Sequence, residues 1–283
     1  MIDETVNQIE EMQTQSASIV AVKAAEALRE LVEREYPTPG KLVRDLERNS
    51  NALKRANHSH APLYTSQRRI VDAVTEPEPE TVEEGKERLR EAIDTVVGEI
   101  ESSKEGAGRR AAELVSDGDV LLAHENSSTV MATLEAALAD GKEFDLYVTE
   151  SRPRFLGRKT TRQLADRDGV DVTLIVDGAA GHYISECDRV LVGMNCLVDD
   201  VVYNRIGTYP MALAAADQSV PMTVVASSAK FIGSGFTFEN THRSASEVML
   251  EPADGFDVAN PGYDATPTRL IDSLVTENAV IDF

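Results

Sequence analysis

The sequence is short of basic residues, lysine above all, and it contains no tryptophan. The chain contains 28 Lys and Arg residues, of which only 8 are Lys, and 49 Asp and Glu residues. The formal net charge is therefore −21. Such an acidic surface repels phosphate polymers, and we therefore expect no direct binding to nucleic acid. Self-repulsion of this size is tolerable in molar salt, where the Debye length is only about 3 Å. The charge pattern thus also predicts a halophilic source.

The sequence also lacks long apolar runs, and it has only two cysteines. No apolar run approaches the roughly 18 residues that span a bilayer, and the first residues lack the basic and apolar regions of a secretory signal. We therefore expect a cytoplasmic protein without membrane contact. Cys187 and Cys196 are too few for a disulfide framework, and no histidine is spaced with them as in a metal site. The sequence therefore predicts no metal and no cofactor.

The hydropathy pattern divides the chain into two parts. Residues 2 to about 115 carry apolar side chains at steps of three and four, which is typical of helices, with breaks at 36–40, at 57–66 and near Pro77. Thr81 followed by Glu84 forms a capping-box pattern that opens a long helix. After residue 118, apolar runs typical of buried parallel strands alternate with helical stretches. They lie at 120–123, 146–148, 172–176, 189–192 and 222–225. The prediction is an α/β protein, with a helical domain over 1–117 and a Rossmann-like, doubly wound domain over 118–283.

Polar residues follow the predicted strands. In open α/β sheets, ligands bind beyond the carboxyl ends of the strands, and Arg152, Arg205 and Lys230 lie there in the sequence. Together with Asn204, they are candidate ligands of an anion such as a phosphorylated metabolite. A structural interpretation stays open, because either arginine can instead form an ion pair with a nearby carboxylate such as Glu125. Neither a dinucleotide-binding GxGxxG motif nor a P-loop motif is present.

Several ordered motifs after residue 120 resemble those of one known family. They are Val-Leu-Val-Gly at 190–193, Asn-Arg-Ile-Gly-Thr at 204–208, Glu-Ser-Arg-Pro at 150–153, Val-Val-Ala-Ser-Ser-Ala-Lys-Phe at 224–231 and Asn-Pro-Gly-Tyr-Asp at 260–264. On these residues the chain is similar to the alpha, beta and delta regulatory subunits of translation initiation factor 2B and their archaeal relatives. The family also includes isomerases of methylthioribose-1-phosphate and ribose-1,5-bisphosphate. The resemblance implies a helical N-terminal domain, a Rossmann-like C-terminal domain, and homodimers or higher homo-oligomers.

The isomerases of this family imply a definite chemistry, from which this chain departs at three places. In those enzymes a Cys after the first strand and an Asp after the fourth move protons while an aldose phosphate becomes a ketose phosphate. Here the Cys position is Glu125, and the Asp position aligns with Asn195, whose amide cannot act as a base. The family's N-terminal phosphate loop corresponds to residues 15–19, which contain no Arg.

These substitutions favour a noncatalytic, oligomeric and regulatory protein of the initiation-factor-2B type. Arg152, Asn204, Arg205 and Lys230 would then hold a sugar or nucleotide phosphate, and translation initiation factor 2 is a candidate partner. The alternative is an aldose–ketose isomerase similar to ribose-1,5-bisphosphate isomerase, with altered acid and base groups. In that case Glu125 would act as the base and Cys196 as the acid. A third interpretation is a metabolite-binding module without any link to translation.

Overall fold

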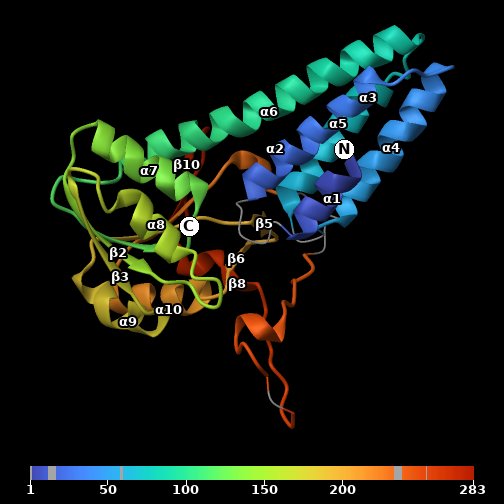
Figure 1. The fold of residues 1–283 in the computed structure, drawn as a ribbon. Coiled ribbons are helices and arrows are strands. Elements are labelled where there is room, and N and C mark those ends of the chain that lie inside the picture. The colour runs from blue at the N-terminus through green and yellow to red at the C-terminus, as the bar shows by residue number, and fades with distance from the viewer. Residues whose placement is uncertain (1, 12–16, 58–59, 233–237, 253) are drawn as a thin grey trace. The chain divides into compact units, whose positions relative to one another are not determined.

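The computed structural model describes residues 2–11, 17–57, 60–232, 238–252 and 254–283 (Figure 1). The chain forms two compact units, Met1–Ser102 and Ser103–Phe283. The first unit is helical and the second contains the strands, which confirms the predicted order of a helical part followed by an α/β part. Among the described residues, no helix combines the length and apolarity needed to cross a membrane.

The helical unit is held together by apolar residues that recur at helical spacing. Val20, Ala24, Leu28 and Leu31 are fully buried and share one core with residues of the later helices. The helices are α1 (Ile2–Glu11), α2 (Ala17–Ala27), α3 (Arg29–Glu33), α4 (Pro39–Arg55), α5 (Ala61–Thr75) and α6 (Val82–Ala112). The last of these, α6, carries the chain from the first unit into the second.

The start of α6 agrees with the capping-box prediction, whereas the predicted loop at 57–66 is wrong in its second half. The Thr81 hydroxyl accepts the N–H of Glu84 at 3.1 Å, and the Glu84 carboxylate accepts the N–H of Glu80 at 2.8 Å. The helix α5 already begins at Ala61. Pro62 does not prevent this, because the first turn of a helix does not need its own N–H donors. Residues 58 and 59 lie outside the described part of the chain.

The second unit is built on a seven-stranded sheet with the order β10-β9-β7-β4-β1-β2-β3. Its strands are β1 (Val120–His124), β2 (Phe144–Thr149), β3 (Val170–Ile175), β4 (Arg189–Val192), β7 (Met222–Val225), β9 (Ser273–Val275) and β10 (Val280–Asp282). Neighbouring strands from β3 to β9 run parallel, and only β10 pairs antiparallel. The five predicted strands correspond to β1, β2, β3, β4 and β7, each within two residues of its predicted ends.

Side chains of the strands alternate between two cores, one on each face of the sheet. In β1, Leu121 and Ala123 pack with residues of α7 (Ser128–Ala139), whereas Leu122 packs with residues of α9 (Ala180–Tyr183) and α10 (Thr208–Gln218). Figure 1 shows α7 above the strands and α9 and α10 below them. Burial on both faces explains the nearly continuous apolar runs of β1, β4 and β7, whereas the edge strand β3 is partly exposed. The two cores on opposite faces confirm the doubly wound arrangement.

A small antiparallel sheet completes the second unit. It has the order β5-β6-β8, from β5 (Cys196–Val198), β6 (Val201–Arg205) and β8 (Tyr263–Pro267). The register pairs Arg205 with Tyr263, and the guanidinium of Arg205 lies 4.9 Å from the centre of the Tyr263 ring. This sheet therefore brings a residue from the end of the chain beside the end of β6.

Candidate functional site

The candidate site lies where the order of the large sheet reverses. Strands β2 and β3 follow β1 on one side, while β4 pairs with its other edge. The carboxyl ends of β1 and β4 therefore flank the crevice in which open α/β sheets bind ligands. Glu125 follows β1 directly, and Asn195 comes shortly after β4. The two positions that the family resemblance indicates thus lie at the same switch point.

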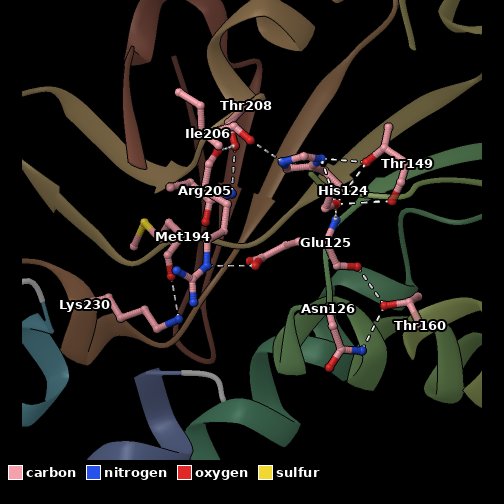
Figure 2. Close-up of polar contacts among 12 residues, drawn as sticks. His124, Glu125, Asn126, Thr149, Thr160, Met194, Arg205, Ile206, Thr208 and Lys230 are labelled. Atoms are coloured by element: carbon pink, nitrogen blue, oxygen red, sulfur yellow. Dashed lines mark hydrogen bonds and ion pairs between the residues drawn. The ribbon is translucent and has the colours of Figure 1, made fainter. Parts of the chain in front are cut away.

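The backbone of Glu125 is held firmly in the left-handed region, with φ at 63°. Its N–H donates to the Ser151 hydroxyl at 2.8 Å, and its carbonyl accepts from the Thr160 hydroxyl at 2.7 Å. The carboxylate points to Arg205, whose Nε lies 3.2 Å from Oε2 (Figure 2). The side chains of Glu125 and Arg205 are only 11% and 14% exposed. The ion pair is therefore largely shielded from solvent. It agrees with the structural interpretation, in which Arg205 pairs with a nearby carboxylate such as Glu125.

Four arginines line a small cavity beside this ion pair. They are Arg152, Arg154, Arg205 and Arg243, and Glu125 lines the same cavity. The cavity measures about 20 Å³, which is space for about one water molecule. Burial, together with the neighbouring charges of Arg205 and Arg154, lowers the pKa of Arg243 to about 10. A cavity with this lining is suited to an anion.

Glu247 supplies a second carboxylate near the cavity. It accepts two hydrogen bonds from Arg154, at 3.2 Å from Nε and 2.6 Å from Nη2, and one from the Asn260 amide at 3.2 Å. Arg154, Arg243 and Glu247 were not predicted from the sequence. Arg154 directly follows the Glu-Ser-Arg-Pro motif and could have been included on that ground. Arg243 and Glu247 lie in an irregular segment with no hydropathy pattern, so nothing in the sequence indicated where they would be.

The other predicted site residues differ in what they contact. Arg152 lines the cavity, and its Nη2 donates to the Val248 carbonyl at 3.0 Å, so its role in binding a ligand stays a prediction. The amide of Asn204 donates to the Thr208 hydroxyl at 2.9 Å, at the start of α10, and Asn204 is not among the lining residues. Asn195 is 5% exposed, and its N–H donates to the Tyr203 carbonyl at 2.8 Å. The structure therefore brings Glu125, Arg152 and Arg205 together, and it gives Asn204 a contact within its own turn.

Lys230 is a buried amine near the ion pair. It is 5% exposed, and its Nζ donates to the Met194 carbonyl at 2.6 Å (Figure 2). Burial lowers the pKa of Lys230 to about 8, although the negative charge of Glu125 opposes this shift. Lys230 therefore adds a positive charge to this region at neutral pH, and it loses that charge in mild alkali.

This pKa predicts how stability depends on pH. The folded-state value of about 8 lies below the ordinary value of 10.5, so the unfolded chain binds more protons between these two values. The contribution of Lys230 to the free energy of unfolding should then rise across this pH range, by up to about 3 kcal/mol. The two buried thiols contribute with the opposite sign above about pH 9, because burial raises their pKa. We expect Lys230→Met to lack this rise when urea denaturation is measured at several pH values. Identical pH profiles of the two proteins would contradict the prediction.

Both cysteines are buried away from the cavity. Cys196 on β5 is fully buried and Cys187 is 7% exposed, and neither is among the lining residues. Burial raises the pKa of each thiol to about 12. A thiol in this state stays protonated at neutral pH and is a poor partner for rapid proton transfer. The geometry gives no support to the hypothesis that Cys196 is the acid opposite Glu125.

His124 is a structural residue behind the site. It is 2% exposed, with Nδ1 2.6 Å from the Thr149 hydroxyl and Nε2 3.0 Å from the Ile206 carbonyl (Figure 2). A carbonyl can only accept, so Nε2 carries a proton. Gly207 lies against this ring, with φ at +109°, and a Cβ at this position would lie 2.9 Å from the ring's Cε1. The close approach requires glycine here.

Two further expectations concern the phosphate loop and metals. Of residues 15–19, which correspond to the family's phosphate loop, residues 15 and 16 lie outside the described part of the chain. Within the described part, no group of three or more His, Cys, Asp or Glu residues is arranged to hold a metal ion.

The fold and the cavity define a Rossmann-like α/β protein with a guanidinium-lined cavity at its switch point. The chain belongs to the initiation factor 2 subunit family, whose model matches residues 13–282. It is 34% identical to the ribose 1,5-bisphosphate isomerase of Haloterrigena turkmenica, over 97% of this chain and 88% of that protein. It is 31% identical to the enzyme of the same name from Methanocaldococcus jannaschii, over 99% of this chain and 91% of that protein.

A solved structure agrees with the fold over its whole length. The chain matches the translation initiation factor eIF-2B of Pyrococcus horikoshii with a TM-score of 0.86 and 26% identity, over 99% of this chain and 96% of that one. The relatives thus carry both of the names that the family resemblance implied. The identities of 30% and more belong to proteins named as isomerases, which favours the isomerase alternative over a noncatalytic initiation factor.

Proposed function

We propose that this protein is a sugar-phosphate isomerase of the ribose-1,5-bisphosphate type, in which Glu125 transfers the proton. The observation that carries the proposal is a shielded ion pair of Glu125 and Arg205 beside a cavity that three further arginine residues also line, near the switch point of the sheet. The guanidinium groups suit a phosphorylated sugar, and the carboxylate suits general base catalysis. The similarity to the Haloterrigena and Methanocaldococcus isomerases supports the choice of substrate.

The reaction needs one group that moves a proton between neighbouring carbons. When the sugar ring opens, the bond between C1 and the ring oxygen breaks. The ring oxygen takes up a proton as this bond breaks. The C2–H bond then breaks, the C2 hydroxyl loses its proton as it becomes a carbonyl, and a new C1–H bond forms. The proton lost by the C2 hydroxyl balances the one gained by the ring oxygen, so no atom is gained or lost. A single carboxylate on one side of the sugar can take the C2 proton and return it to C1. Arg205, which lies 3.2 Å from Glu125 in the free protein, would hold a phosphate group of the substrate once Glu125 turns to the sugar.

A second candidate function is binding of a phosphorylated metabolite without turnover. Two observations favour it. Asn195, at the position of the family's Asp, cannot give up a proton, and Cys196 is buried outside the cavity with its pKa raised to about 12. The same cation-lined cavity would then serve as a sensor, in line with a regulatory role. Binding of translation initiation factor 2, homo-oligomerisation and a cytoplasmic location remain parts of this candidate function to be tested.

An isomerase assay separates the two functions. Ribose-1,5-bisphosphate is incubated with the protein in concentrated KCl, and formation of the ketose bisphosphate is followed, with methylthioribose-1-phosphate in parallel. We expect turnover by the natural protein and a loss of about 100-fold or more in kcat for Glu125→Gln. The matched control is Glu150→Gln, because Glu150 pairs with Arg158 and does not line the cavity. A thermal shift without turnover would support the sensor. The absence of both a thermal shift and turnover would contradict both functions.

A further inference from the structure

The carboxylate of Glu125 stands where a ligand's anionic group would go. The cavity has space for about one water molecule, far less than a phosphate group needs. Four arginine residues and Glu125 line it, and the carboxylate of Glu125 lies against the guanidinium of Arg205. An entering phosphate can therefore reach Arg205 only if the Glu125 carboxylate moves aside.

The contacts of Glu125 divide it into a fixed and a movable part. The backbone is fixed by the hydrogen bonds to Ser151 and Thr160. Among the described residues, the carboxylate makes a single hydrogen bond, from Arg205 Nε to Oε2 at 3.2 Å (Figure 2). Rotation about the side-chain bonds can therefore release the carboxylate while the chain around it keeps its place.

The neighbouring ion pair of Arg154 and Glu247 differs in this respect. Glu247 holds Arg154 through two hydrogen bonds and also accepts from Asn260, so three contacts would have to break before it could move. Bidentate pairs of this kind are among the stronger ion pairs in proteins. Of the two carboxylates beside the cavity, Glu125 is thus the one that a ligand can replace.

We propose that Glu125 is an internal counter-ion of Arg205, which the anionic group of the ligand must displace, and that it sets the charge of the ligands the cavity accepts. A phosphate dianion can compete with it, because it brings more charge and more acceptor oxygens than a carboxylate. A neutral sugar cannot compete for Arg205. The inference rests on the proposed function for the identity of the site, and it adds a selection for phosphorylated over neutral sugars.

Binding of inorganic phosphate tests this inference apart from catalysis. Calorimetric titrations of the natural protein and of Glu125→Gln are compared at one KCl concentration at which both are folded. The glutamine has the same shape but no charge, so we expect Glu125→Gln to bind phosphate at least about tenfold more tightly, which corresponds to about 1.4 kcal/mol. Glu150→Gln, which removes a charge outside the cavity, should bind as the natural protein does, and the gain should vanish in Glu125→Gln/Arg205→Met.

The outcomes distinguish this inference from the proposed function. Equal or weaker phosphate binding by folded Glu125→Gln overturns the inference, even if the natural protein isomerises its substrate. A gain in phosphate affinity together with absent turnover supports the inference and contradicts the isomerase. If Glu125→Gln does not fold, Glu125→Asp replaces it, because the shorter side chain retracts the carboxylate from Arg205. A smaller gain in phosphate affinity is expected from that variant, because its carboxylate keeps its charge, and the absence of any gain overturns the inference.

Discussion

Alanine at position 207 should lower the free energy of unfolding of the α/β unit by about 3 kcal/mol. Two costs add up. Gly207 has φ at +109°, which costs a residue with a Cβ roughly 1–2 kcal/mol. The new Cβ would also lie 2.9 Å from Cε1 and 3.0 Å from Nε2 of His124. The ring cannot retreat easily, because hydrogen bonds to Thr149 and Ile206 hold both of its nitrogens. Chemical denaturation at constant KCl measures the loss.

Gly178 provides the matched control for this substitution. A Cβ at Gly178 would meet nothing within 4 Å. Gly178→Ala should therefore change the free energy of unfolding by no more than about 0.5 kcal/mol. A Gly207→Ala protein as stable as Gly178→Ala would show that neither the positive φ of residue 207 nor the ring of His124 opposes the new Cβ.

Methionine in place of Arg205 is the second substitution with a large expected effect. It removes the guanidinium that neutralises Glu125 and leaves a carboxylate that is only 11% exposed without this partner. Loss of one partner from a shielded pair costs about 3 kcal/mol or more. Adding Glu125→Gln should recover at least about 1 kcal/mol of this loss, because the buried carboxylate without a partner is then removed. Urea denaturation of the two single variants and the double variant measures the coupling.

The ion pair of Arg158 and Glu150 provides the control, measured in the same way with two single variants and the double variant. Arg158 is 42% exposed, so solvent screens its 2.9 Å contact with Glu150. Its coupling energy should be below about 1 kcal/mol. A coupling between Glu125 and Arg205 no larger than this would mean that solvent reaches the switch point more freely than the exposed fractions of the two side chains suggest.

The sequence predicted the strands that form mostly apolar runs. The runs that became β1, β4 and β7 are visible because nearly all of their residues are buried. Strands β2 and β3 were also found, although they contain the exposed Asp145 and Asp171 and β3 lies at the edge of the sheet. The short strands β5, β6 and β8 form a separate antiparallel sheet, and they are three to five residues long. Strands β4 and β7 are similarly short, but their residues are nearly all buried, whereas buried residues in β6 and β8 are interrupted by more exposed ones, so no continuous apolar run marks them. The start of α5 was missed because His60, Ala61 and Pro62 resemble a loop in composition.

The candidate site could be predicted only as far as it follows the strand ends. Glu125, Arg152 and Arg205 were expected near one another for that reason, and they line one cavity. Asn204 also follows this rule, yet its amide is used by Thr208 within its own turn, and local capping of this kind competes with ligand binding. Arg243 comes from an irregular segment, and tertiary structure alone brings it to the cavity.

The two buried thiols give this protein an internal reporter of unfolding. Alkylating reagents attack the thiolate, and in the folded chain Cys187 and Cys196 are both shielded from solvent and kept in the thiol form by burial. Each reacts only when its own strand or turn opens. The rate of modification at the two positions therefore measures local opening on either side of β4, without any label having to be introduced.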